Sequence, residues 1–370
     1  MKLVVLLIFL GQTLREAQPV SNLLAADLNG DRLPDLITQT AQGYGVYLNR
    51  GRLRFEAVDT IKGIGVGEPG GCALADMNGD GLIDLISGSH DSYRIAVLLG
   101  NGKGGFQAVA GSPLVPRKSG KPHNHSLAVA DLNGDLIPDI ASANIGDGDL
   151  TLMLGDGKGG FREAANSPLK MGAGAYQVKI ADINQDRIPD LLVASTDDRG
   201  PDLLVALGKG KGNFEVVQSA DAQDHKIRSA QLELTDWDGD GNLDAVVGPG
   251  HDGRPHVLPG DGKGHFRRSP KALPGQGRTW QFQVSNRMIV AAAGDHVDVI
   301  QGEKVRRIEA GAATWNLVIA DFDGNGKPDV AAASGVEVRV HSLDGFIDLR
   351  GRLEANRDGI HLAKLHHEFD

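Results

Sequence analysis

Short apolar runs follow one another along most of the chain, separated by turn-forming residues. A typical stretch reads LAVA, an acidic segment, IASA, and then a run ending LMLG before a glycine-rich turn and Phe161. Runs of this length, with Gly, Asn and Asp between them, are typical of strands joined by tight turns. Four such runs recur in each unit of the sequence, so we expect units of four antiparallel strands.

An acidic segment of nine residues recurs six times and marks these units. The copies read DLNGDRLPD from Asp27, DMNGDGLID from Asp76, DLNGDLIPD from Asp131, DINQDRIPD from Asp182, DWDGDGNLD from Asp236 and DFDGNGKPD from Asp321. Successive copies start 49, 55, 51, 54 and 85 residues apart, so the last interval has room for two units. Within it, residues 279–294 keep both flanking runs but have Asn286-Arg287 in place of the acidic segment. Such units predict an all-β fold: a seven-bladed β-propeller with four-stranded antiparallel blades, six with acidic loops and one degenerate.

The two ends of the chain differ from the repeats. Lys2 and the apolar run after it predict a signal peptide or other N-terminal apolar segment over residues 1–13. The alternative is that this run forms an extra buried strand. We expect the propeller over residues 14–349, with residues 14–20 or 345–349 supplying the outer strand that closes the ring, and a charged tail over residues 350–370. A transmembrane span is not expected, because a helix needs about 20 apolar residues to cross a bilayer.

Composition narrows the class of protein further. The 370 residues include 51 glycines and 16 prolines, and only 5% are aromatic, which suits short strands and argues against a helical bundle or coiled coil. A single cysteine, Cys72, excludes an intramolecular disulfide framework. The formal net charge of −10 argues against a nucleic-acid partner.

The acidic segments predict calcium sites. Side-chain oxygens at positions 1, 3, 5 and 9 of a tight loop, together with the backbone carbonyl of position 7, suit Ca²⁺ rather than Zn²⁺. The competing reading, in which Asp and Asn only form turns, explains one such loop but not six. The helix–loop–helix calcium motif does not fit, since β-type runs flank these segments. We therefore expect up to six Ca²⁺ ions, at Asp27, Asn29, Asp31, Leu33, Asp35; Asp76, Asn78, Asp80, Leu82, Asp84; Asp131, Asn133, Asp135, Ile137, Asp139; Asp182, Asn184, Asp186, Ile188, Asp190; Asp236, Asp238, Asp240, Asn242, Asp244; and Asp321, Asp323, Asn325, Lys327, Asp329.

Two further expectations follow from these loops. Position 4 is Gly in five copies, which predicts a left-handed backbone there, and Gln185 at this position predicts a strained or weaker fourth site. Weak calcium sites fill at the millimolar calcium found outside cells. A secreted, periplasmic or cell-envelope location is therefore expected, in agreement with the N-terminal apolar run.

These motifs resemble the FG-GAP/VCBS repeat family, whose calcium-loop blades also build the integrin α-subunit propeller. The resemblance covers about residues 14–349 and departs from the pattern at Gln185 and near Asn286. It implies the propeller fold and the calcium role of the loops. It does not imply a ligand, because such propellers serve as adhesion modules, lectins and sugar-modifying enzymes.

A ligand is expected on the loop face opposite the calcium sites, where the innermost strands begin. Aromatic rings beside amides at these positions suggest a carbohydrate platform, with an extracellular protein as the second class of ligand. The competing reading is an aromatic plug that fills the central channel. The candidate ligand-binding residues are His125, Tyr176, Gln177, Trp280, Gln281, Trp315, Asn316, His90 and His251.

Enzyme activity and scaffolding remain alternatives. His123, His125 and Tyr176 could supply acid–base groups for a polysaccharide lyase or related sugar-modifying enzyme. Several histidines on one face could instead bind a second metal, or be unremarkable exposed residues. An adhesion or assembly scaffold without a small ligand is the third possibility. The sequence sets no oligomeric state.

Overall fold

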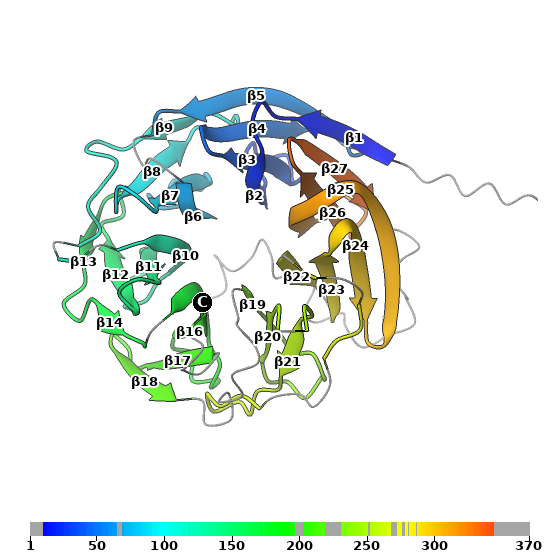
Figure 1. Ribbon diagram of the computed structural model, residues 1–370. Coiled ribbons are helices and arrows are strands. Elements are labelled where there is room, and N and C mark those ends of the chain that lie inside the picture. Colours follow the sequence, from blue (N-terminus) through cyan, green and yellow to red (C-terminus); the bar gives the residue numbers. More distant parts are fainter. Residues whose placement is uncertain are drawn as a thin grey trace, which may run out of the picture.

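The computed structural model describes residues 10–64, 69–117, 119–120, 122–172, 174–196, 203–218, 231–250, 252–267, 272–275, 278–279, 281–285 and 287–343. Within these ranges every regular element is a β-strand, and the strands form six hydrogen-bonded sheets. The sheets are arranged around a common axis, with β2, β6, β10, β19 and β22 innermost (Figure 1). The described residues include no helix long and apolar enough to cross a membrane.

The first four sheets follow one another along the chain, each with its strands in sequence order from the inside outwards. They consist of β2 (Val20–Ala26), β3 (Asp35–Thr40), β4 (Gly43–Asn49) and β5 (Phe55–Lys62); β6 (Pro69–Ala75), β7 (Asp84–Ser89), β8 (Ile95–Gly100) and β9 (Phe106–Ala108); β10 (Asn124–Ala130), β11 (Asp139–Asn144), β12 (Asp149–Gly155) and β13 (Phe161–Glu163), with β14 (Leu169–Lys170) also paired to β12; and β15 (Ala175–Ala181), β16 (Asp190–Ser195), β17 (Leu203–Gly208) and β18 (Phe214–Gln218).

The remaining strands form two sheets of unequal size. The fifth sheet has three described strands, and the sixth has seven. They consist of β19 (Gln231–Thr235), β20 (Asp244–Gly248) and β21 (His256–Leu258); and β22 (Gln281–Ser285), β23 (Met288–Ala292), β24 (Gly294–Gln301), β25 (Lys304–Ala320), β26 (Asp329–Ser334), β27 (Glu337–Ser342) and β1 (Leu10–Arg15).

The all-β propeller with blade-like antiparallel sheets is confirmed, but the expectation of seven separate four-stranded blades is wrong in that form. Five sheets have the size of a single blade, with three to five strands each, and the sixth is continuous over seven. The physical reason is β25, a strand of 17 residues with no turn in it. Its first part pairs with β24 and its last part with β26, so two groups of strands are hydrogen-bonded into one sheet.

The register places the acidic segments in one structural position. Ala26 pairs with Asp35 in the first sheet, Ala130 with Asp139 in the third and Ala320 with Asp329 in the sixth. Each acidic segment is therefore the hairpin loop between an innermost strand and the strand outside it. Because the register repeats, all six loops lie at the same end of their strands.

The core lies between neighbouring sheets. The second strands β3, β7, β11, β16, β20 and β26 are buried at every position. One core cluster joins Ile86 and Val97 of the second sheet to Ile140 and Met153 of the third. Small aliphatic side chains let adjacent sheets pack closely, which explains why this chain needs few aromatic residues.

The N-terminal strand closes the ring. Leu14 pairs with Val338 of β27, and its side chain is buried in the cluster that joins the first and last sheets. Leu14 and Arg15 thus belong to the outer strand. The sequence offered two alternatives for this strand, and this is the N-terminal one. β1 also includes residues 10–13, which the sequence assigned to the N-terminal segment. The competing segment 345–349 and the charged tail lie outside the described residues.

Candidate functional site

Each acidic loop is held by hydrogen bonds from its own backbone. In the first loop, Asp27 Oδ1 accepts from the Gly30 N–H at 2.7 Å and Oδ2 accepts from the Arg32 N–H at 2.8 Å. Asp31 Oδ1 accepts from the Leu33 N–H at 2.9 Å. Corresponding bonds recur in the later loops, so position 1 organises the loop and directs its carboxylate inwards.

The aspartate at position 9 connects the loop to the sheet. Asp35 is fully buried, and its two oxygens accept from the N–H groups of Leu28 at 2.8 Å and Asn49 at 2.7 Å. Burial raises the pKa of this carboxyl to about 6, and neighbouring carboxylates add to the shift. The same burial raises the pKa of Asp329 to about 7. These buried carboxyls are the positions where a bound cation would offset the largest desolvation cost.

Two loops bring carboxylates together closely enough to share a cation. Ligand oxygens of Asp236, Asp238 and Asp244 all lie within 4.8 Å of one another, and so do those of Asp321, Asp323 and Asp329. The donors are carboxylate oxygens without histidine or cysteine, which fits a hard ion such as Ca²⁺ and not a zinc site. The converging residues occupy positions 1, 3 and 9, and the position 5 carboxylate of Asp240 is outside its group.

The left-handed backbone predicted at position 4 is present in all six loops. The glycines there have φ between 74° and 84°, and Gln185 has φ 62°. Position 6 is left-handed as well, including the non-glycine residues Arg32, Leu136 and Arg187. The sequence did not reveal this second position, because glycine occupies it in only some of the copies. Gln185 Nε2 also donates to Gly241 O at 3.2 Å and Asn242 Oδ1 at 2.9 Å, so the fourth loop contacts the fifth.

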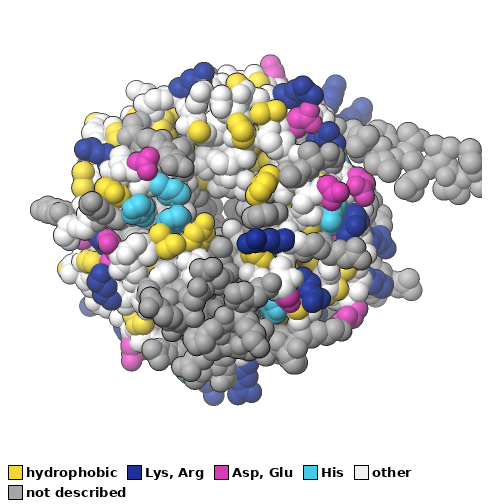
Figure 2. Space-filling view, viewed as in Figure 1, with side chains coloured by type: hydrophobic (Ala, Val, Ile, Leu, Met, Phe, Trp, Pro, Cys, Tyr) yellow, Lys and Arg dark blue, Asp and Glu magenta, His cyan; other side chains and the backbone are white. Residues whose placement is uncertain are grey.

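At the opposite end of the inner strands, histidine and tyrosine rings form a cluster, hereafter the His–Tyr cluster (His90, Tyr93, His123, His125 and Tyr176). The His125 ring lies 4.2 Å from that of His90 and 4.8 Å from that of Tyr176, measured between centroids. The ring of His123 lies 5.2 Å from that of Tyr93. Figure 2 shows a group of histidine side chains on the viewed face, over the region of β10. The cluster joins residues from three sheets that are consecutive in the chain: His125 and Tyr176 lie in β10 and β15, and the other three lie in loops.

Electrostatics keep the centre of this cluster neutral near pH 7. Burial, together with the repulsion of a second positive charge by His90 and His123, lowers the pKa of His125 to about 4. The ligand atoms of these histidines are not among the groups that converge within 4.8 Å in the described part of the chain. The described part of the cluster is therefore a group of tilted aromatic rings in contact, without three ligand atoms that converge.

A depression of about 310 Å³ adjoins the cluster. It is lined by residues 145–148, Lys170 and Gly172. Gly146 connects the two features, since a Cβ atom added to it would lie 3.8 Å from His123. The floor is rich in glycine, so polar backbone groups and the Asp147 and Lys170 side chains are accessible in it.

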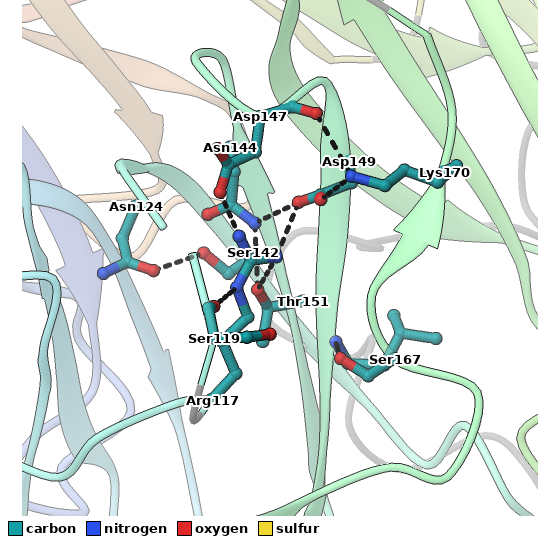
Figure 3. Close-up of polar contacts among 11 residues, drawn as sticks. Arg117, Ser119, Asn124, Ser142, Asn144, Asp147, Asp149, Thr151, Ser167 and Lys170 are labelled. Atoms are coloured by element: carbon teal, nitrogen blue, oxygen red, sulfur yellow. Dashed lines mark hydrogen bonds and ion pairs between the residues drawn. The ribbon is translucent and has the colours of Figure 1, made fainter. Parts of the chain in front are cut away.

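Buried charges fix the wall of this depression (Figure 3). Arg117 is 6% exposed and donates to Asp149 Oδ1 at 2.9 Å, to the Ser119 carbonyl at 2.6 Å and to the Asp147 carboxylate. Lys170 Nζ donates to the other Asp149 oxygen at 2.7 Å. The side chains lie around Asp149, which is fully buried, so the loop between β11 and β12 is held in one position.

The other predicted ligand residues have different surroundings. Gln177 Oε1 accepts from the Leu232 N–H, and Gln281 Oε1 accepts from the Leu317 N–H at 2.7 Å. These amides join neighbouring inner strands, a use that the sequence reasoning missed. Trp315 is 45% exposed in β25, next to Asn316, which pairs with Ala333. Trp280 and His251 lie outside the described residues.

The sequence also missed two parts of this face. Tyr93 and the depression beside Lys170 were not among its candidates. The string HDSY, which places Tyr93 three residues after His90, was the available signal for the tyrosine. The sequence carried no signal for the depression, because the depression forms where β14 pairs with β12.

The structure is similar to solved propellers of several kinds. An Agrocybe aegerita lectin, described as specific for non-reducing terminal N-acetylglucosamine, is 18% identical with a TM-score of 0.55, over 88% of this chain and 86% of that one. BBS1N in complex with ARL6DN is 12% identical with a TM-score of 0.61, over 89% and 93%. Staphylococcus aureus virginiamycin B lyase is 10% identical with a TM-score of 0.57, over 90% and 98%. At these identities the likeness establishes the fold alone.

Sequence comparison identifies the repeats. No curated protein matches the chain. The FG-GAP-like repeat matches residues 27–87, 76–142, 131–193 and 182–247, which together cover more than half of the chain and five of the acidic loops. With its repeated hairpin loops and antiparallel sheets, the chain belongs to the FG-GAP repeat family.

Proposed function

We propose that the protein is a calcium-stabilised binding module whose His–Tyr cluster and adjoining depression bind carbohydrate. The observation that carries this proposal is the contact of the His125 ring with the rings of His90 and Tyr176 at the loop face, at centroid distances of 4.2 and 4.8 Å and with the rings tilted by 39° and 36°. Neutral aromatic faces pack against the C–H surfaces of sugars, and nearby polar groups can bind the hydroxyls.

The depression supports this choice of ligand. Its volume of about 310 Å³ lies at the lower end of the range for small-ligand pockets, about 300 to 1,000 Å³, which suits a sugar unit. Asp147 and Lys170 offer an acceptor and a donor side by side. The similar lectin agrees with this reading, although it shares only the fold.

Calcium is proposed as the structural cofactor, with up to six ions. In each loop the carboxylate and amide oxygens of positions 1, 3, 5 and 9 and the carbonyl of position 7 would hold the ion. Bound Ca²⁺ would neutralise carboxylates that otherwise repel one another across a short loop. Since weak calcium sites fill at millimolar concentrations, we propose a secreted, periplasmic or cell-envelope location.

We further propose that the ring consists of seven repeats. The seven-stranded sheet would then contain two of them, one ending in the first part of β25 and the next beginning in its last part. The sequence supports this, because the interval between Asp236 and Asp321 is 85 residues, against 49 to 55 elsewhere. The Thr279–Gly294 segment would begin the additional repeat.

The ligand is tested by a glycan array with the calcium-loaded protein. We expect binding to a defined set of glycans, with Tyr176→Ala weakening it about tenfold or more, the loss of one stacking anchor. His265→Ala is the matched control, because His265 is an exposed histidine in the hairpin between Gly260 and Phe266, away from the cluster. An array without hits from folded protein would contradict the carbohydrate assignment and favour a protein ligand.

The calcium proposal is tested separately. Calorimetric titration of chelator-treated protein with CaCl₂ should give heats of binding, and the melting temperature should rise with calcium concentration. The stoichiometry counts the occupied loops. An absence of both effects would contradict the calcium assignment without affecting the glycan result.

A further inference from the structure

Arg287 extends from the repeat without an acidic loop to the loop of its neighbour. Ser285 pairs with Met288, so Arg287 belongs to the tight turn between β22 and β23, where the other repeats have the acidic segment. Its Nε donates to the backbone carbonyl of Asp236 at 3.2 Å. Asp236 is position 1 of the fifth loop.

The guanidinium also lies directly against the middle of that loop. A Cβ atom added to Gly239 would be 1.9 Å from Nη2 and 2.8 Å from Cζ of Arg287. A side chain larger than hydrogen at position 239 would require the guanidinium to move. The positive charge of Arg287 is therefore held over position 4 of the fifth loop by both a hydrogen bond and a close backbone contact.

The fifth loop is the most acidic of the six. It has aspartate at positions 1, 3, 5 and 9, whereas each other loop has an asparagine at position 3 or position 5. On its other side it receives a neutral contact, from Gln185 to Gly241 and Asn242. Within the described part of the chain, Arg287 is the one charged side chain that an adjacent repeat places on this loop. It thus contacts the loop that has the extra carboxylate.

We propose that Arg287 is a resident counter-charge of the fifth loop, which lowers its affinity for calcium and keeps the loop folded when calcium is absent. This inference rests on the proposed calcium binding. A fixed positive charge repels an incoming cation, and the same charge relieves the repulsion among the carboxylates of the empty loop. Because Arg287 is exposed, water and salt weaken the effect, so we expect a change in affinity of several-fold and at most about tenfold.

The chain contains its own reporter for this loop. Trp237 is position 2 of the loop, and its backbone N–H donates to Asp244 Oδ2 at 2.7 Å. Terbium, a luminescent substitute for Ca²⁺, can be excited through tryptophan at a wavelength where tyrosine does not absorb. Terbium bound in the fifth loop is therefore detected through Trp237, and Trp237→Phe removes that component of the signal.

The experiment is a terbium titration, with calcium competition, of wild type and Arg287→Gln. Arg287→Gln should bind several-fold more tightly than wild type at low ionic strength, and the difference should shrink in high salt. Arg287→Lys, which keeps the charge, should behave like wild type. Arg15→Gln is the control: it removes an exposed charge from β1, at the opposite edge of the same sheet, and should give no salt-dependent difference in the terbium signal of the fifth loop. In chelator, Arg287→Gln should melt at a lower temperature than wild type.

Two results would overturn the inference. Equal or weaker terbium binding by Arg287→Gln would exclude the repulsive role. An increase that does not depend on salt would assign Arg287 a steric role instead of an electrostatic one. Both results differ from a failure of calcium binding itself. Such a failure would appear as the absence of any heat of binding when the wild-type protein is titrated with calcium.

Discussion

The rings of His90 and His125 are in contact, with centroids 4.2 Å apart and a tilt of 39° between them, although the two residues come from different repeats and are 35 positions apart in the chain. His125 is the second residue of the inner strand of the third sheet, and His90 directly follows the second strand of the second sheet. Adjacent blades therefore share one aromatic surface. The His–Tyr cluster also affects the stability of the protein at acidic pH.

Protonation of His125 should destabilise the fold. Its pKa is about 4 in the folded protein and about 6.5 when unfolded, so the unfolded state binds the extra proton between these values. The contribution of His125 is fully present above pH 6.5 and falls as pH drops towards 4. When the pH is lowered from 7 to 4.5 in the presence of calcium, the unfolding free energy of both proteins should fall. The fall should be about 1 to 2 kcal/mol smaller for His125→Phe than for wild type, as measured by urea denaturation. His265→Phe serves as control and should follow the wild-type profile.

The buried Arg117–Asp149 pair should be necessary for the third sheet. Arg117→Ala would leave Asp149 buried without its guanidinium and should lower the unfolding free energy by about 3 to 5 kcal/mol. Lys170→Ala removes the other, largely exposed partner and should cost less than about 1 kcal/mol. Denaturant titration distinguishes the two variants. Similar losses for both would mean that Arg117 carries no special role.

Closure by β1 should depend on packing and not on charge. Leu14 is 4% exposed, so Leu14→Ala should cost about 2 to 3 kcal/mol of unfolding free energy through the cavity that it leaves. Arg15, the next residue, forms an exposed ion pair with Glu337, and Arg15→Ala should cost less than about 1 kcal/mol. Thermal melts of both variants would check this. A larger effect from Arg15→Ala would contradict packing as the cause.

Of the two left-handed positions in the acidic loops, position 4 should be destabilised by a side chain, whereas position 6 already carries one in some loops. Gly134 has φ 84° and no atom within 4 Å of an added Cβ, so Gly134→Ala tests backbone strain alone. We expect a loss of about 1 kcal/mol in calcium-free protein. Leu136→Ala is the control, because that residue already accepts φ 65° with a side chain. Equal stabilities of Gly134→Ala and wild type would remove strain as the explanation for the glycines.

The sequence by itself determined the strands, the repeat and the candidate calcium residues. These are local properties: Asp and Asn at alternate positions of a tight turn, and apolar runs on each side, specify a hairpin loop wherever they occur. Thus the loop from Asp27 to Asp35 and the left-handed Gly30 could be expected without coordinates, and so could the family resemblance.

Only the tertiary structure decided which distant residues meet. The contact of His90 with His125, the contact of Arg287 with the fifth loop and the continuity of β25 depend on how sheets pack and on strand pairing. No repeat of the sequence encodes these contacts, because each arises between units and not within one. For the same reason Gln177 and Gln281, which the sequence assigned to ligand binding, have their side-chain oxygens bonded to the next inner strand. Buried backbone N–H groups require partners, and the nearest acceptor on the neighbouring strand supplies one.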